Sequence, residues 1–255
     1  MKKSSRKTYK METKSNEEQL KLREILYKLF RERPLSDEEL LICPGLFMRS
    51  STLTKILFIN EAYELILNKP GIIVEFGTWW GQNIILFENL RAIYEPFNQS
   101  RRIVGFDTFS GYPRISNKDK KSDTIKIGGY NVVKNYENYL RQLIDYHEKN
   151  NVLGSIKKHE IIKGDVSVTA PKYFKKNKSK IIALAYFDMA LYQPTKLALK
   201  SIIPNLVPGS IIMLDEFNNH DYPGETLAFK EVFKKIDYSV KTSKFIKDRT
   251  FIIIK

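Results

Sequence analysis

The chain has 255 residues, of which 42% are hydrophobic, so it is long enough to bury one substantial core. Its apolar runs, such as IIALAYF at 181–187, fall short of the ~20 residues that cross a bilayer, and no apolar signal core follows the basic start, so we expect a cytoplasmic protein with no membrane partner. The single cysteine, Cys43, excludes an internal disulfide and a multi-cysteine metal site.

The charge balance is strongly basic, with 43 Lys and Arg against 29 Asp and Glu, a net +14. Such a balance suits a nucleic acid, an acidic membrane surface or a phosphorylated substrate. Residues 1–33 alone carry 11 basic and 5 acidic side chains, and the remaining excess is dispersed lysine. We therefore favour a solvated lysine-rich surface over a dedicated nucleic-acid face.

The N-terminal part of the chain reads as a tail followed by helices. Residues 1–16 are polar and basic, and we expect a flexible tail there. Residues 17–70 form a predicted helical extension, with apolar residues at helical spacing over 17–30, a capping-box pattern at Ser36 and Glu39, and a longer apolar helix that ends near residue 67. Residues 71–255 are predicted to form one further domain.

From residue 72 the pattern alternates strands and helices, which predicts an α/β, Rossmann-like, doubly wound and mostly parallel seven-stranded sheet. The last two strands, over 238–243 and 249–254, are predicted to form an antiparallel hairpin. The other strands are predicted from residue 72 and over 102–107, 160–163, 180–188 and 210–215. Helices are predicted over 83–94, 132–149, 194–204 and 224–235, with a short one capped by Thr169.

The stretch IIVEFGTWWG at 72–81 joins the first strand to a glycine-punctuated turn and then to a helix. Gly77, Thr78 and Gly81 are candidate cofactor-binding residues, because such a turn lets a ligand approach the main chain. It is neither GxGxxG nor a P-loop, so it suits a pyrophosphate poorly, whereas a cation would sit well near Glu75. This favours S-adenosylmethionine over a dinucleotide. The alternative is an ordinary tight turn.

Acidic residues follow the predicted strands, where ligands bind in sheets of this topology. Asp107 is the candidate acceptor for the two ribose hydroxyls, and Asp165 is a candidate for the exocyclic amine of adenine. Each has an alternative role as a turn cap. Asp188, Asp215 and Glu216 follow two neighbouring strands and are candidate ligands for magnesium or another hard cation, which would lower the pKa of an acceptor hydroxyl. Their alternative role is to cap strand ends.

Five blocks together resemble the macrocin O-methyltransferase family over about residues 74–233. They are VEFGTWWGQN, FDTFSGYP, KGDVSVTAP, FDMALYQPTKLALKSIIPNLVPGSIIMLDEF and YPGETLAFKEVF. The resemblance implies methyl transfer from S-adenosylmethionine to a sugar hydroxyl, with magnesium held at Asp188, Asp215 and Glu216. It also implies a helical N-terminal region that takes part in oligomers and closes the site. Ala190 and Glu216 stand where the family commonly has Asp.

Two residues are candidates for the catalytic base: Asp188, as the resemblance suggests, and His220, whose side chain titrates nearer neutral pH. The acceptor is expected to be a nucleotide-linked sugar, because its diphosphate suits a basic surface, and the 108–130 segment is expected to shape the acceptor pocket. Two other functions stay open. A nucleic-acid methyltransferase or RNA-binding protein would explain the charge, and a NAD-dependent oxidoreductase would share the fold but lacks its glycine fingerprint.

Overall fold

A computed structural model describes residues 15–120, 122, 124–247 and 249–255, so most of the expected basic tail lies outside the described residues. The chain divides into two compact units, Met1–Lys55 and Ile56–Lys255. None of the helices in these described ranges is long and apolar enough to cross a membrane.

The first unit contains short helices that begin at sequence-encoded caps. In α2 (Asp37–Ile42) the side chains of Ser36 and Glu39 form the predicted capping box. In α1 (Glu17–Arg31) Asn16 and Gln19 form a second one, which was not predicted. A short 3-10 helix, η1 (Pro44–Phe47), follows the second. α3 (Ser50–Glu64) begins in this unit and continues into the second.

The second unit is built on a seven-stranded sheet with the order β3-β2-β1-β4-β5-β7-β6. The first five strands are parallel, and β7 pairs antiparallel with both β5 and β6. This arrangement confirms the predicted fold class. The strands are β1 (Ile72–Phe76), β2 (Ile103–Asp107), β3 (His159–Lys163), β4 (Ile182–Phe187), β5 (Ile211–Leu214), β6 (Tyr238–Thr242) and β7 (Thr250–Ile254).

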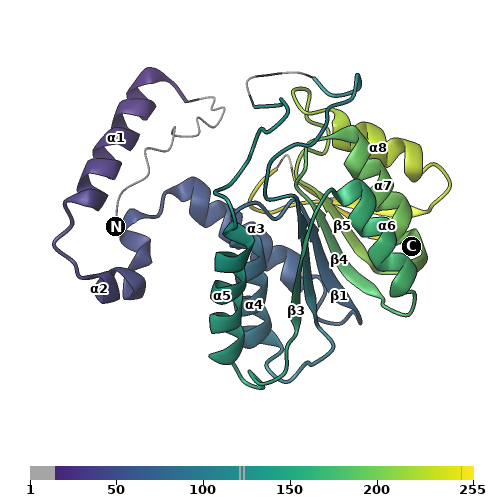
Figure 1. The fold of residues 1–255 in the computed structure, drawn as a ribbon, viewed down its shortest axis with the longest axis horizontal. Coiled ribbons are helices and arrows are strands. Elements are labelled where there is room, and N and C mark those ends of the chain that lie inside the picture. The colour runs from purple at the N-terminus through teal and green to yellow at the C-terminus, as the bar shows by residue number, and fades with distance from the viewer. Residues whose placement is uncertain (1–14, 121, 123, 248) are drawn as a thin grey trace. The chain divides into compact units, whose positions relative to one another are not determined.

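Helices cover both faces of the sheet (Figure 1). Residues of α3, α4 (Gln82–Tyr94) and α5 (Tyr136–Lys149) share one buried apolar cluster with Ile73, while α6 (Val166–Lys176), α7 (Tyr192–Ile202) and α8 (Gly224–Val232) share the other with Val74 and Phe76. A short 3-10 helix, η2 (Ile203–Asn205), follows α7. Successive residues of β1 face opposite clusters, which is why all five are buried and apolar residues run almost unbroken through the strand.

Two predicted helix starts were wrong: α5 begins at Tyr136 and not near residue 132, and α6 begins before its predicted cap. α6 begins at Val166, three residues before the Thr169 cap that the sequence pattern suggested. Asp165 occupies the N-cap, where its side chain accepts a hydrogen bond from the Ser167 N–H at 2.8 Å. Thr169 lies inside the helix and donates its hydroxyl to the Asp165 carbonyl at 3.0 Å. Asp165 caps the helix in place of Thr169 because its carboxylate accepts a hydrogen bond from a first-turn N–H, which has no partner within the helix.

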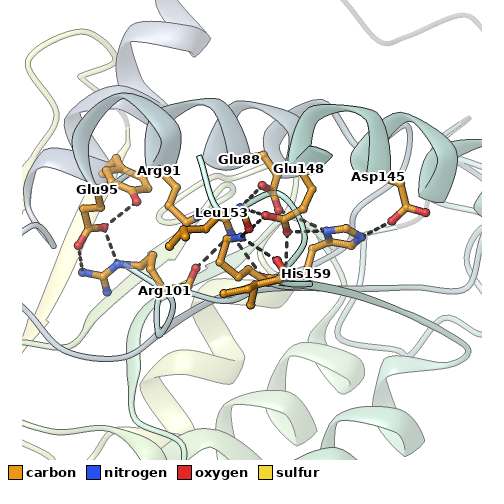
Figure 2. Close-up of polar contacts among 11 residues, drawn as sticks. Glu88, Arg91, Glu95, Arg101, Asp145, Glu148, Leu153 and His159 are labelled. Atoms are coloured by element: carbon orange, nitrogen blue, oxygen red, sulfur yellow. Dashed lines mark hydrogen bonds and ion pairs between the residues drawn. The ribbon is translucent and has the colours of Figure 1, made fainter. Parts of the chain in front are cut away.

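A buried ionic network joins α4, α5 and β3 at the N-terminal edge of the sheet (Figure 2). Arg91 pairs with Glu88 and places Nη2 2.8 Å from Glu148 Oε1. Lys158 Nζ lies 2.5 Å from the same Glu148 oxygen, and His159 Nδ1 lies 3.1 Å from the other. The network therefore fastens α4 and α5 to the start of β3.

Within the described ranges, Glu88, Glu148 and His159 each offer a ligand atom within 4.8 Å of the others, a spacing that suits a metal ion. Arg91 and Lys158 already supply two positive charges to the same carboxylates. A divalent cation would add positive charge to a network that is balanced by side chains, so we interpret it as structural.

A second buried cation, Arg101, pairs with Glu95 (Figure 2) and ties the start of the sheet to the preceding turn. Its guanidinium donates to the carbonyls of Gly71, Lys69 and Ile66 at 2.7, 2.8 and 2.9 Å. Glu95 Oε2 accepts from its Nε at 2.8 Å. The cation thus donates to several carbonyls of the turn through which the chain enters β1.

The ionic network predicts a stability change with pH through Glu88. Burial raises the pKa of Glu88 to about 7, although the neighbouring Arg91 opposes the shift. Between the unfolded pKa near 4.5 and this value, the folded protein holds a proton that the unfolded chain has lost. Glu88 therefore makes the unfolding free energy fall as pH rises through this window, by up to about 3 kcal/mol.

In urea unfolding, the difference in unfolding free energy between wild type and Glu88→Gln should fall from pH 5 to pH 7 and stay constant at higher pH. A difference that is independent of pH would contradict the assignment.

Candidate active site

The C-terminal edge of the parallel strands gathers most of the residues predicted to form the site. β1 lies between β2 and β4, so the strand order reverses there, and this is where ligands bind in open sheets of parallel strands. Asp107 ends β2, Asp188 follows β4, and Asp215 with Glu216 follows β5. The β1–α4 turn and these acids therefore lie at one edge of the sheet.

Gly77 allows the β1–α4 turn to pass directly against residue 188. Its φ is 94°, and a Cβ built on it would lie 2.1 Å from the Asp188 carbonyl oxygen. The Asp188 N–H donates to the Phe76 carbonyl at 2.8 Å, so the two backbones are joined at this point. Any side chain at position 77 would separate them. The buried Thr78 continues the turn toward β2, where its N–H meets the Phe106 carbonyl at 3.3 Å.

Gly81 is the N-cap of α4 and has a left-handed backbone with φ 79°. A Cβ at this position would lie 2.3 Å from Leu140 Cδ1 of α5. The need for glycine therefore comes from helix packing as well as from the turn. Its predicted part in cofactor binding stays a prediction.

Asp107 connects the β1–α4 turn to the end of β2. Its Oδ2 accepts the Trp79 N–H at 2.7 Å, and its Oδ1 accepts the Phe109 N–H at 2.6 Å. Burial raises the pKa of Asp107, and these N–H groups oppose that shift. Each carboxylate oxygen can accept a further hydrogen bond, so both the turn-capping and the ribose-binding roles are compatible with this geometry.

The other two predicted cofactor acids lie on either side of Asp107 in the sheet. Glu75 is fully buried in β1 and accepts from Asn83 Nδ2 at 2.8 Å. Asp165 follows β3, caps α6, and pairs with Arg114 Nη2 at 3.2 Å. Both positions are consistent with the cofactor crevice, and their contacts with a cofactor stay predictions.

The three acids predicted to bind metal differ in their surroundings. Asp188 is exposed, whereas Asp215 is buried and accepts from the Tyr186 hydroxyl. Arg249 faces Asp215 with two nitrogens, Nη2 at 3.0 Å and Nε at 3.3 Å. Asp215 thus already has a charged partner.

Glu216 is half-buried and accepts from the side chain of Asn219. Burial raises the pKa of Glu216 to about 7, with further increases from the charges of Asp215 and Asp188 and an opposing decrease from Arg249. The three carboxylates therefore lie within electrostatic reach of one another. Together they carry more negative charge than Arg249 balances.

His220, the other candidate base, lies on the loop between β5 and α8. Its side chain is 95% exposed, and its Nδ1 lies 3.5 Å from Asp221. The structure thus places this imidazole in solvent, unlike Asp215 and Glu216.

Sequence reasoning missed Arg249, Tyr186 and Glu225. Arg249 reaches Asp215 from the hairpin between β6 and β7, and no spacing in the sequence indicates that contact. Tyr186 was detectable as a tyrosine in a buried strand, which needs a hydrogen-bond partner. Glu225 lies in the stretch YPGETLAFKEVF, in the first turn of a helix. An acid is common at that position, so the sequence does not single it out.

Glu225 is fully buried in α8. Its Oε1 accepts the N–H groups of Met189 at 2.9 Å and Ala190 at 2.8 Å, and its Oε2 accepts that of Glu216 at 3.1 Å. Burial raises the pKa of Glu225 to about 8, outweighing these donors, which favour the ionised form.

The 108–130 segment is fastened to the loops that follow β4 and β5. Asp119 Oδ1 accepts the Tyr192 N–H at 2.7 Å, and Lys118 Nζ donates to the Tyr192 hydroxyl at 2.8 Å. Lys120 pairs with Asp221 at 2.8 Å. These contacts fasten the segment near the strand-end acids, and its part in an acceptor pocket stays a prediction.

The close approach at Gly77 predicts a large effect of a single methyl group. Gly77→Ala should lower the unfolding free energy by at least about 2 kcal/mol more than Gly128→Ala, because both have positive φ but only Gly77 would meet backbone atoms within 4 Å. Urea unfolding of the two variants checks this, and equal losses would show that the β1–α4 turn is not packed against residue 188.

Comparison with known proteins agrees with this geometry. The family model for macrocin O-methyltransferase (TylF) matches residues 54–241. A crystal structure of CalS11, a calicheamicin methyltransferase, is 34% identical with a TM-score of 0.89, covering 98% of this chain and 99% of that one. An apo structure of CalS11, a TDP-rhamnose 3'-O-methyltransferase, is 33% identical with a TM-score of 0.82, covering 94% and 96%.

The O-methyltransferase NovP, at 18% identity and a TM-score of 0.61 over 79% of this chain and 80% of that one, shares the fold. A search of curated proteins finds no match. The family model covers most of the chain. The activity of the family, methyl transfer, accounts for a glycine turn that lacks a dinucleotide fingerprint. The chain belongs to the macrocin O-methyltransferase family and is an S-adenosylmethionine-dependent O-methyltransferase.

Proposed function

We propose that the enzyme methylates a hydroxyl of a nucleotide-linked sugar in the biosynthesis of a natural product or polysaccharide. The observation that carries this is the likeness to CalS11 along nearly the whole chain, since its apo structure is that of a TDP-rhamnose 3'-O-methyltransferase. The net charge of +14 supports an acceptor that carries a diphosphate.

The methyl donor would bind over the β1–α4 turn. Asp107 would accept hydrogen bonds from the ribose hydroxyls, and Asp165 would accept one from the adenine amine. Gly77 and Thr78 would allow the methionine part of the donor to approach the main chain closely. Glu75 would favour a cation nearby. The contact between Gly77 and the Asp188 carbonyl supports this arrangement, because it sets the donor turn beside an exposed acid. A methyl group is transferred only when donor and acceptor are held in line at close range.

Asp188, Asp215 and Glu216 would hold a divalent cation, magnesium being the natural candidate. The donor types fit, since all the ligands would be carboxylate oxygens. Burial raises the pKa of Glu216, and the charges of Asp215 and Asp188 add to the shift, so negative charge gathers at this position. When bound, the ion would lower the pKa of an acceptor hydroxyl. Asp188, the exposed member, would take the proton, and His220 is the second candidate for that role.

The N-terminal helical extension over 17–70 would pair subunits in a homo-oligomer. Support comes from α1 and α2, which bury no residue. Their large apolar side chains with more than half their surface exposed are Leu22, Ile25, Leu29, Leu41 and Ile42. Sedimentation of the intact chain would measure the number of subunits.

A screen of nucleotide sugars with methyl-labelled S-adenosylmethionine tests the reaction and the acceptor together. Label should enter a nucleotide sugar and not the corresponding free sugar or RNA. Label found only in RNA, or in no nucleotide sugar, would contradict the proposed acceptor class.

Removing the proposed base should affect turnover and not donor binding. Asp188→Ala should lower kcat by about 10²- to 10⁴-fold, the usual contribution of a positioned base, with S-adenosylmethionine affinity changed by about twofold at most. Asp237→Ala removes an exposed acid before β6 and should behave as wild type.

Kinetics and calorimetry on both variants check this prediction. Full activity of Asp188→Ala would exclude Asp188 as the base, and full activity in EDTA would exclude the metal.

A further inference from the structure

Glu225 is a buried carboxylate whose hydrogen-bond partners are main-chain N–H groups. No part of its surface is exposed, and both of its oxygens accept bonds from the backbone. Burying a carboxylate is costly, so an apolar residue would be the simpler way to pack α8 against the sheet. The geometry of these bonds indicates what the carboxylate contributes.

The two oxygens bind different loops. Oε1 accepts from Met189 at 2.9 Å and Ala190 at 2.8 Å, directly after Asp188, whereas Oε2 accepts from Glu216 at 3.1 Å. One side chain therefore bridges the loop after β4 and the loop after β5. These are the loops that carry the acids of the proposed site.

The surrounding backbone is shaped to let this carboxylate reach both loops. A Cβ on Gly224 would lie 2.6 Å from both the Ala190 carbonyl oxygen and the Tyr192 nitrogen, so only glycine brings the start of α8 this close. Ala190 has a left-handed φ of 59°, which is uncommon for a residue with a Cβ. The Thr226 hydroxyl accepts the Asn218 N–H at 2.7 Å, so the next residue also holds the β5 loop.

We propose that Glu225 is a positioning residue for methyl transfer, whose carboxylate fixes Asp188 and Glu216 relative to each other without contacting the substrate. This inference rests on the proposed function, because that function assigns the chemistry to these acids. A misplacement of about 1 Å in a catalytic group can lower the rate by about 10²-fold, so such a bridge has kinetic consequences.

Glu225→Gln tests the bridge with little change of shape. A carboxyl group, with or without its proton, can accept on both oxygens, whereas an amide has one accepting oxygen and one donating nitrogen, so in the variant at least one of the three N–H groups must face a donor. The favoured orientation keeps the oxygen on Met189 and Ala190 and releases Glu216. We expect kcat to fall by about 10- to 100-fold while S-adenosylmethionine affinity changes by about twofold at most, since the Gly77 turn keeps its contacts.

Glu148→Gln is the matched control. Glu148 is also a buried carboxylate that accepts a backbone N–H, that of Lys158 at 2.9 Å, but it lies in the ionic network at the other edge of the sheet. Glutamine in place of Glu148 would likewise turn a donating amide nitrogen toward a hydrogen-bond donor. We expect Glu148→Gln to lower Tm by about as much as Glu225→Gln does, while its kcat stays at the wild-type value.

Amide hydrogen exchange tests the Glu225 bridge directly, without a measurement of methyl transfer. Glu225→Gln should speed exchange at residue 216 relative to wild type, and Glu148→Gln should not. The inference is overturned if Glu225→Gln leaves exchange at residue 216 unchanged or leaves kcat unchanged. An equal loss of kcat in Glu148→Gln would also overturn it. If the wild type methylates an acceptor other than a nucleotide sugar, the proposed function fails, and the same comparison of kcat and exchange is made with that acceptor.

Discussion

The contact between the Gly77 turn and the backbone of Asp188 is the constraint on which the proposed site depends. β1 and β4 are neighbours at the reversal of strand order, and the Asp188 N–H bonds to the Phe76 carbonyl at 2.8 Å. A crevice formed by the first turn of such a sheet therefore lies beside the end of β4. The absence of a Cβ at Gly77 sets how close a methyl donor in that crevice would lie to the acid.

Negative charge at this edge is held in place by partners from distant parts of the chain. Arg249 and Tyr186 bind Asp215, and Glu225 accepts the backbone N–H of Glu216. Burial raises the pKa of Glu216, and the charges of Asp215 and Asp188 raise it further, while Arg249 lowers it. The ionic network around Glu148 contrasts with it, because Arg91 and Lys158 pair with its carboxylates and leave no need for a further cation.

The sequence predicts the fold and the location of the acids because both follow from local periodicity. Asp107 ends one strand, and Asp188 and Asp215 directly follow two others, so these residues must come to one edge once the strands are parallel. It does not predict the partners that hold them. Arg249 reaches Asp215 across 34 residues of chain, and Glu225 reaches Met189 across 36. The cap of α6 was misassigned for a local reason: Asp165 and Thr169 can both cap a helix, and the stronger acceptor does so.

Crystals of the protein grown with S-adenosylhomocysteine and Mn²⁺ would test the central claim, that the strand-end acids form a cation site beside the donor. Anomalous diffraction should show an ion bounded by the carboxylates of Asp188, Asp215 and Glu216, next to a cofactor lying over the Gly77 turn. An ion at Glu88, Glu148 and His159 instead, or a cofactor bound away from that turn, would contradict the account.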